Sequence, residues 1–182
     1  MPENSSRQAG PAVSVIMPVF NGASHVEDAV LSILGQTFGD FEFIIIDDGS
    51  TDGAGEILAR LAAGDSRIVL MRRENRGIVA SLNEGLARAR APLIARMDAD
   101  DVASPQRLEL QARAFARRPS LVLLGGQARM IDGDGRPRRR LLMPVGAERV
   151  RATLLRTCPF IHPAVMFRRR TALDIGGYRA AF

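Results

Sequence analysis

The chain has 182 residues and a formal net charge of +5, and 46% of its residues are hydrophobic and 25% charged. This length and composition predict one domain with a buried core and exclude a mainly disordered chain. All 25 basic residues are arginine, which excludes a P-loop and a pyridoxal Schiff base, because each of these sites requires a lysine.

The termini and the cysteine content set further bounds. The single cysteine, Cys158, excludes an intramolecular disulfide and favours a reducing compartment. No stretch of the sequence reaches the roughly 18 apolar residues of a membrane span. Residues 1–11 lack the apolar segment of a signal peptide, so we expect them to form a disordered leader to a domain that begins at residue 12.

From residue 12 onward, short apolar runs alternate with segments of helical spacing, which predicts alternating strands and helices. A Ser-Pro pair at 104–105 is typical of an N-cap followed by proline at the first helical position. A turn is expected at 132–135, followed by a basic stretch at 136–140. The expected strands lie at 13–17, 41–46, 68–71, 93–97, 121–124 and, more weakly, 164–167. The expected helices lie at 26–34, around 57–61, at 78–89, from 104 to about 117, and at 148–155.

This alternation indicates βαβ units. The sequence therefore predicts an α/β fold with a mainly parallel sheet and helices on both of its faces. In such a sheet, binding sites form at the carboxyl ends of the strands. Polar clusters follow the expected strands at those ends, at 18–21, 47–52, 75–77 and 98–101.

The strongest local signal is the acidic cluster after the strand at 93–97. Asp98 and Asp100 lie two residues apart, so in extended backbone their carboxylates point the same way. Two such carboxylates are suited to Mg²⁺ or Mn²⁺ and leave positions for a substrate's phosphate oxygens. The alternative is that Asp101 and Ser104 only cap the next helix. Because acids this close repel one another without a cation among them, we favour the metal site.

A second acidic cluster follows the strand at 41–46. A carboxylate at a strand end, such as that of Asp48, can accept hydrogen bonds from a nucleotide base or a ribose. The alternative is an Asx turn and a helix cap over residues 48–52. Because two acidic clusters follow neighbouring strands, we favour a binding role for Asp48, and less strongly for Asp47.

Two loops at the same edge add weaker signals. Pro18, Phe20 and Asn21 leave the first strand in a loop that can lay an aromatic ring and backbone amides against a planar base. Asn75 and Gly77 precede a helix whose free N–H groups can approach a phosphate. Each of these segments, taken alone, is also typical of a plain turn.

The remaining candidates are weak. A lone histidine among apolar residues, such as His162, is more often a core side chain than a catalyst, so we keep it only as an acceptor-side candidate. The arginines at 138–140 favour a solvated edge, with contact to anionic lipid or a phosphorylated acceptor as the alternative. One tyrosine and no tryptophan argue against a stacking platform for single strands, so we expect no nucleic-acid partner.

Together these motifs resemble an inverting glycosyltransferase of family 2 with the GT-A fold, a Rossmann-like fold of nucleotide-diphospho-sugar transferases. The resemblance covers residues 12–182 and preserves order and spacing. It implies a nucleotide-binding half at 12–126 and the start of an acceptor-side half at 127–182. The matching segments are VSVIMPVFNG, LSILGQTFGDFEFIIIDDGSTD, ENRGIVASLNEGLARARAPLIARMDADD, SPQRLELQ, IHPAVMFRRR and IGGYR.

The resemblance implies transfer of a sugar from a nucleotide-diphosphate donor, preferably a UDP-sugar, to an acceptor hydroxyl with inversion and with help from Mg²⁺ or Mn²⁺. Asp48 would read the base, with Pro18 and Phe20 lining its pocket. Asp100 would hold the metal that bridges the diphosphate, and Asp98, the first acid of the family's DxD motif, would face the ribose or the sugar. The resemblance also implies a saccharide or lipid-linked acceptor. It further implies a cytoplasmic enzyme that acts at the inner face of the plasma membrane in the synthesis of cell-envelope polysaccharide.

The general base is a departure from the family pattern. In this family it is a carboxylate in an acidic motif soon after the GGYR segment, and no acid follows Asp174 here. We therefore expect the base to lie beyond Phe182, and the chain to hold the donor half of the site without being catalytically complete.

Two other functions remain open from the sequence. A haloacid-dehalogenase-like phosphatase also has a DxD pair after a buried strand, but usually after its first strand and with a later lysine, which this chain lacks. A non-catalytic nucleotide-binding module would keep the same fold without turnover.

Overall fold

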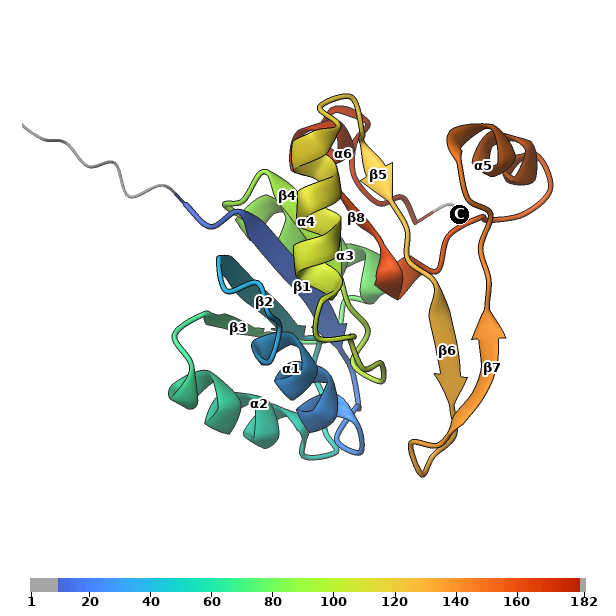
Figure 1. Ribbon diagram of the computed structural model, residues 1–182. Coiled ribbons are helices and arrows are strands. Elements are labelled where there is room, and N and C mark those ends of the chain that lie inside the picture. Colours follow the sequence, from blue (N-terminus) through green and yellow to red (C-terminus); the bar gives the residue numbers. More distant parts are fainter. Residues whose placement is uncertain (1–9, 181–182) are drawn as a thin grey trace, which may run out of the picture.

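The computed structural model describes residues 10–180, so the expected leader, apart from Gly10 and Pro11, lies outside the described residues. The main sheet consists of β1 (Val13–Val19), β2 (Phe41–Asp47), β3 (Ile68–Arg72), β4 (Leu93–Arg96), β5 (Leu123–Leu124) and β8 (Met166–Arg168). Its strand order is β3-β2-β1-β4-β8-β5 (Figure 1). Strands β1 to β4 are mutually parallel, whereas β8 runs antiparallel to β4 and β5. The predicted mainly parallel sheet is confirmed.

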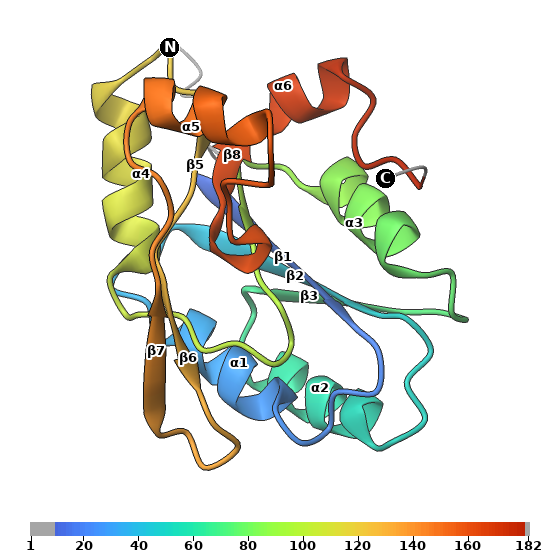
Figure 2. The same ribbon diagram turned by 90° about the vertical axis from the view of Figure 1, so that its right-hand side faces the viewer.

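Helices cover both faces of this sheet, as the sequence predicts (Figure 2). The alternation of side chains along β1 shows why both faces are apolar. Val15 and Met17 belong to one buried cluster, and Ile16, between them, belongs to the cluster on the opposite face. The first face carries α1 (Val26–Leu34), α2 (Ala54–Gly64) and α4 (Arg107–Arg117), and the second carries α3 (Ile78–Arg88) and α6 (Arg169–Asp174).

The start of α4 differs from the expectation. The helix begins at Arg107 and its N-cap is Gln106, which makes no side-chain capping bond, so the predicted Ser-Pro start at 104–105 is wrong. Ser104 instead closes a turn, accepting a hydrogen bond from the Arg107 N–H at 3.0 Å. The side chain of Gln36, distant in sequence, accepts from the Leu108 N–H at 2.9 Å. A tertiary contact thus satisfies an N-terminal donor of this helix, which local sequence could not indicate.

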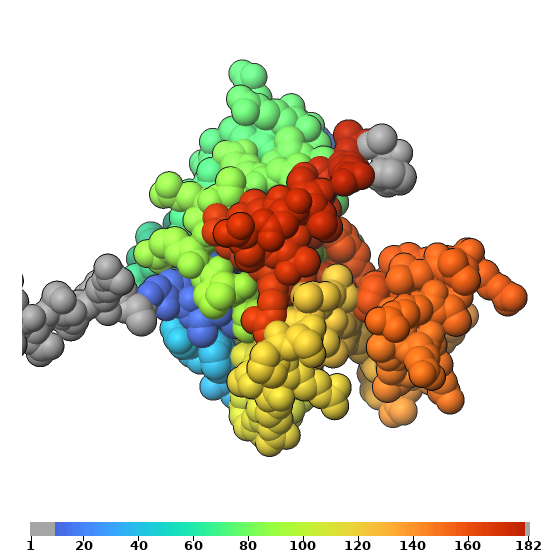
Figure 3. Space-filling model, turned by 90° about the horizontal axis from the view of Figure 1, so that it is seen from above, coloured from blue at the N-terminus to red at the C-terminus, as the bar shows by residue number. Residues whose placement is uncertain are grey.

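The part of the chain after β5 holds elements that the sequence did not predict. The basic stretch at 136–140 pairs as a strand of a small hairpin around the expected turn, in which Gly135 N–H donates to Asp132 O at 2.9 Å. The helix expected at 148–155 is present one residue earlier, and this region projects from the side of the main body (Figure 3). Its elements are β6 (Ala128–Ile131), β7 (Pro137–Leu141) and α5 (Ala147–Leu154). The 3₁₀ turn His162–Ala164 that follows packs against β4 of the main sheet.

A buried carboxylate fastens the amino-terminal ends of the central strands. Glu42 on β2 is 4% exposed, and it accepts hydrogen bonds from Ser14 Oγ at 2.6 Å and from the Arg90 backbone N–H and Nε at 2.7 Å. Burial alone would raise the pKa of Glu42, but the hydrogen bonds from Ser14 and Arg90 hold it below its ordinary value of 4.5. The ionised form is therefore the one that the fold stabilises.

We expect Glu42→Gln to lower the free energy of unfolding by about 1–2 kcal/mol at pH 7, because it weakens a buried charged contact whose Arg90 partner is largely exposed. A folded-state pKa below the unfolded one gives stability that is present above about pH 4.5 and is lost as the pH falls through the folded value. The difference between the two proteins should therefore shrink in acid. Urea unfolding between pH 3 and 8 measures it, with the exposed pair variant Glu109→Gln as a control that changes little. An E42Q deficit that stays constant down to pH 3 contradicts the assignment.

Candidate functional site

The polar clusters predicted from sequence meet at one edge of the sheet. The segments that follow β1, β2 and β4, together with the loop between β3 and α3, surround a cleft of about 200 Å³. Every residue expected to bind the nucleotide-sugar lines this cleft except Asn21. Its lining is Pro18, Val19, Phe20, Asp48, Asn75, Gly77, Ile78, Ser81 and Asp98.

Asp48 lies at the buried end of the cleft and is held from three directions. It is 3% exposed, and its two carboxylate oxygens accept hydrogen bonds from the backbone N–H of Arg76 at 2.9 Å and of Gly77 at 2.8 Å. The guanidinium of Arg73 also pairs with it. Asp48 therefore fixes the β3–α3 loop in position. Its Oδ1 contacts both Arg76 and Arg73, whereas Oδ2 accepts only from Gly77 and keeps a lone pair that can accept a ligand donor.

Apolar side chains form the open sides of the cleft. Phe20 is 55% exposed and Ile78 is 53% exposed, although both are large hydrophobic residues. Exposed apolar surface in a concave site is typical of a ligand-binding region. Ile78 and Ser81 were not predicted, but both lie in the first turn and a half of the helix that Asn75 and Gly77 precede, and that spacing could have indicated them.

Asn21 supports the cleft from outside it. Its backbone has a positive φ of 53°, and its side-chain oxygen accepts a hydrogen bond from the Thr51 N–H at 2.9 Å. Its own N–H donates to Ser50 Oγ at 3.0 Å. Asp47 is similarly occupied, since it accepts from the Ser50 N–H at 3.0 Å and pairs with Arg72. The Asn21 side chain ties the loops after β1 and β2 together, and the Asp47 side chain ties the loop after β2 to β3. Neither side chain lines the cleft.

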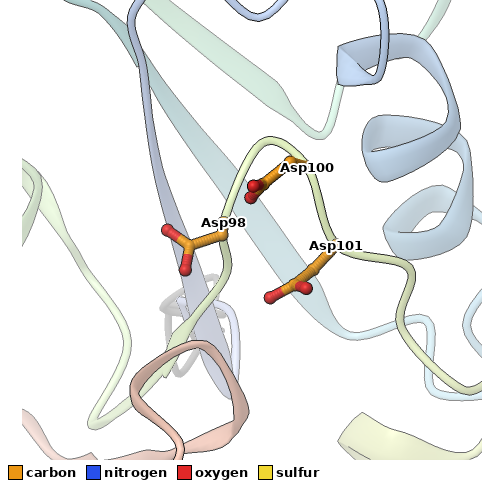
Figure 4. A group of neighbouring side chains, drawn as sticks. All are labelled: Asp98, Asp100 and Asp101. Atoms are coloured by element: carbon orange, nitrogen blue, oxygen red, sulfur yellow. The ribbon is translucent and has the colours of Figure 1, made fainter. Parts of the chain in front are cut away.

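Three carboxylates gather in the loop after β4. Asp98, Asp100 and Asp101 each offer an oxygen within 4.8 Å of the others (Figure 4), and we call these residues the acid cluster. Asp101 was expected as a possible helix cap, but α4 begins only at Arg107, so its carboxylate is free to join the cluster. Burial, followed by repulsion from Asp98 and Asp100, raises the pKa of Asp101. Three hard oxygen donors that repel one another suit Mg²⁺ or Mn²⁺.

Two arginines lie beneath the acid cluster. The guanidinium of Arg96, the last residue of β4, pairs with Asp98 and is 2% exposed. Arg107 donates to the Arg96 backbone oxygen at 2.6 Å. Burial lowers the pKa of Arg107 to about 10, with the attraction of Asp101 opposing this shift and repulsion from Arg96 adding to it. Arg107 is therefore cationic at neutral pH. No local pattern in the sequence indicates that these two arginines would meet the acids.

The weak candidate His162 lies on the same side of the molecule. Its Nε2 is 3.4 Å from the hydroxyl of Tyr178, and the two ring centroids are 5.6 Å apart. Burial, then the charge of Arg96, lower the pKa of His162, while Asp98 opposes them. Burial raises the pKa of Tyr178, which Arg96 counteracts. The charge of Arg96 therefore acts on both rings, and that of Asp98 acts on His162.

Comparison with solved structures shows the same fold. The mannosyltransferase PcManGT from Pyrobaculum calidifontis, solved in complex with GDP-Man and Mn²⁺, aligns with a TM-score of 0.69 and 22% identity over 93% of this chain and 48% of its own. S. aureus TarS 1–349 in complex with UDP-GlcNAc aligns with a TM-score of 0.70 and 20% identity over 90% of this chain and 47% of its own. The domain is of the GT-A class, with an acidic DxD pair at the end of a central strand.

The chain belongs to glycosyl transferase family 2, whose family model matches residues 14–176. EpsE of Bacillus subtilis is 33% identical over 94% of this chain and 62% of its own length. Hyaluronan synthase of Pasteurella multocida is 32% identical over 73% of this chain and 14% of its own. TuaG of B. subtilis, named for teichuronic acid biosynthesis, is 38% identical over 70% of this chain and 50% of its own. The chain thus spans only part of each relative.

Family membership and topology remove the phosphatase alternative, because the DxD pair follows β4 and not the first strand. A separate finding concerns membranes. Among the helices within residues 10–180, none has the length and apolar character needed to cross a bilayer.

Proposed function

We propose that this domain binds a nucleoside-diphosphate sugar and transfers the sugar to an acceptor hydroxyl with inversion, assisted by Mg²⁺ or Mn²⁺. The observation that carries the proposal is that Asp98 belongs both to the cleft lining and to the acid cluster. A single ligand can therefore place an apolar, planar end in the cleft and an anionic end at a cation. A nucleoside diphosphate has this shape and charge.

The cleft suits the nucleoside part. Phe20, Pro18 and Ile78 offer apolar surface to a planar base, and Asp48 Oδ2 offers a fixed acceptor at the buried end. Asn75 and Gly77 add polar backbone to the rim, and Asn21 holds the facing loop. An acceptor at the buried end favours a base with an N–H donor, as in uracil, so we propose a UDP-sugar as donor. The UDP-GlcNAc complex of TarS supports this choice, while the GDP-Man complex of PcManGT keeps guanine as the alternative.

The acid cluster suits the diphosphate part. Asp98, Asp100 and Asp101 would hold the Mg²⁺ or Mn²⁺ ion, which supplies charge neutralisation of the diphosphate leaving group, so that this group departs without being protonated. The Mn²⁺ in the PcManGT complex supports this assignment. Asp98, which also lines the cleft, would accept a hydrogen bond from the ribose or the sugar.

We assign residues 12–126 to donor binding and residues 127–182 to the acceptor side, which holds the His162–Tyr178 pair. Because His162 is held neutral, it can bind an acceptor hydroxyl without adding charge. No residue of this chain is assigned as the general base. The names of TuaG and hyaluronan synthase support a saccharide or lipid-linked acceptor. We also propose that the protein acts at the inner face of the plasma membrane.

Isothermal calorimetry with UDP, GDP, ADP and CDP, each with and without Mn²⁺, tests the proposal. We expect UDP to bind most tightly and to require Mn²⁺. The proposal is contradicted if nucleotide affinity does not depend on Mn²⁺, or if none of the four nucleotides binds. Mass spectrometry of UDP-sugars incubated with the protein and saccharide acceptors separates an enzyme from a non-catalytic module, since only an enzyme joins the sugar to an acceptor hydroxyl and releases UDP.

A further inference from the structure

The guanidinium of Arg96 is a buried cation that hydrogen bonds do not account for. Its side chain is 2% exposed, and neither Nε nor Nη1 has a hydrogen-bond partner among residues 10–180. The contact of Nη1 with Asp98 Oδ1 is an ion pair that does not meet hydrogen-bond geometry. Burying a guanidinium is costly unless nearby charge compensates it. For Arg96 that charge comes from the acid cluster.

The backbone around Arg96 keeps this cation in place. Its N–H donates to Val165 O at 3.0 Å, and its carbonyl oxygen accepts from Arg107 Nη2 at 2.6 Å. Arg96 lies on β4, between β1 and β8 in the sheet. Because its side chain is buried, a second cation that approaches Asp98 must share the cluster with the positive charge of Arg96.

We propose that Arg96 is a positioning residue and an internal counter-ion for the acid cluster. It holds Asp98 at the junction of cleft and cluster, and its charge keeps the cluster from capturing a divalent cation before the nucleotide arrives. The diphosphate then brings the negative charge that lets the cation bind beside Arg96. Cation and nucleotide binding are coupled as a result, and by linkage each strengthens the other. This inference rests on the proposed function.

Replacing Arg96 by methionine tests the inference, because methionine fills similar space without charge. Mn²⁺ binding is measured from the electron paramagnetic resonance signal of free Mn²⁺, without nucleotide and with saturating UDP. For the unaltered protein we expect weak Mn²⁺ binding alone and a gain of at least about tenfold with UDP. For Arg96→Met we expect Mn²⁺ alone to bind about tenfold more tightly, because a repelling charge is gone, and the gain with UDP to shrink. Arg96→Lys, which keeps the charge, should restore weak nucleotide-free binding.

A control variant and a double variant complete the experiment. Arg67→Met removes a partly buried arginine paired with Asp65, away from the cleft lining, and should leave Mn²⁺ binding unchanged. If Arg96→Met does not fold, the double variant Arg96→Met/Asp98→Asn removes both charges of the pair, and it should still bind Mn²⁺ several-fold more tightly than Asp98→Asn alone.

The outcomes separate this inference from the proposed function. If Arg96→Met, or the double variant against its parent, binds Mn²⁺ no more tightly without nucleotide, the inference is overturned, while UDP-dependent Mn²⁺ binding by the unaltered protein leaves the proposed function standing. If no protein of the series binds Mn²⁺ with or without UDP, both are overturned. Tighter nucleotide-free binding in the variant with a reduced gain from UDP supports the inference, and a merely structural role for Arg96 would not produce it.

Discussion

Replacing Asp100 by asparagine is expected to weaken Mn²⁺-dependent binding of UDP by about 100-fold. Asp100 is an exposed member of the acid cluster, and asparagine has nearly the same shape but no charge. A divalent cation held by carboxylates loses most of its binding energy when one of them becomes neutral. Because the side chain is at the surface, the free energy of unfolding should change by less than about 0.5 kcal/mol.

Calorimetry with UDP and Mn²⁺ measures this effect, and thermal unfolding of the same samples shows that the fold is intact. Asp134→Asn is the matched control, since Asp134 is an exposed aspartate in the β6–β7 turn, remote in sequence from the cluster. If D100N binds UDP in the presence of Mn²⁺ as tightly as the unaltered protein does, Asp100 does not hold the cation.

Replacing Asp48 by asparagine should affect both stability and nucleotide binding. The new NH₂ group would face one of the two backbone N–H groups whose hydrogen bonds Asp48 now accepts. Within residues 10–180, the buried guanidinium of Arg73 would keep only Glu84 as its charged partner. We expect a loss of about 2–4 kcal/mol in the free energy of unfolding, because a buried donor and a buried charge lose their partner. UDP affinity should fall at least about tenfold, since the loop that carries Asn75 and Gly77 is no longer held.

Asp65→Asn is the control for Asp48→Asn, because it breaks a partly buried aspartate–arginine pair that is not part of the cleft lining. It should lower the stability somewhat and leave UDP affinity unchanged. Both variants are compared at a temperature at which circular dichroism shows them fully folded. Full UDP affinity in folded D48N protein would show that Asp48 has only a structural role.

Local patterns in the sequence predicted the framework of this fold well. The strands at 13–17 and 41–46 and the helix at 26–34 are apolar runs and amphipathic spacings that need no distant partner to be recognised, and all three are present. We expected polar clusters to meet at the carboxyl ends of the parallel strands, and Asp48 and Asp98 do line one cleft there. These features follow from side-chain periodicity and from the geometry of βαβ units.

The features that the sequence missed depend on contacts between distant residues. The α4 helix starts at Arg107, and the side chain of Gln36 accepts a hydrogen bond from the Leu108 N–H in its first turn. Asn21 lies in a loop whose residues suggested ligand binding, yet its side-chain oxygen accepts a hydrogen bond from the Thr51 N–H. Strand β7 is rich in arginine and lacks alternating apolar residues, so only its pairing with β6 defines it. The burial of Arg96 beneath the acids likewise depends on the packing of β8 beside β4.

A crystal structure of the protein with UDP and Mn²⁺, recorded with anomalous diffraction at the manganese edge, tests the central claim most directly. We expect one anomalous peak among the carboxylates of Asp98, Asp100 and Asp101, the diphosphate beside it, and the uracil ring in the cleft between Phe20 and Asp48. A manganese peak away from these carboxylates, or a nucleotide bound outside the cleft, would contradict the assignment of this edge of the sheet as the donor site.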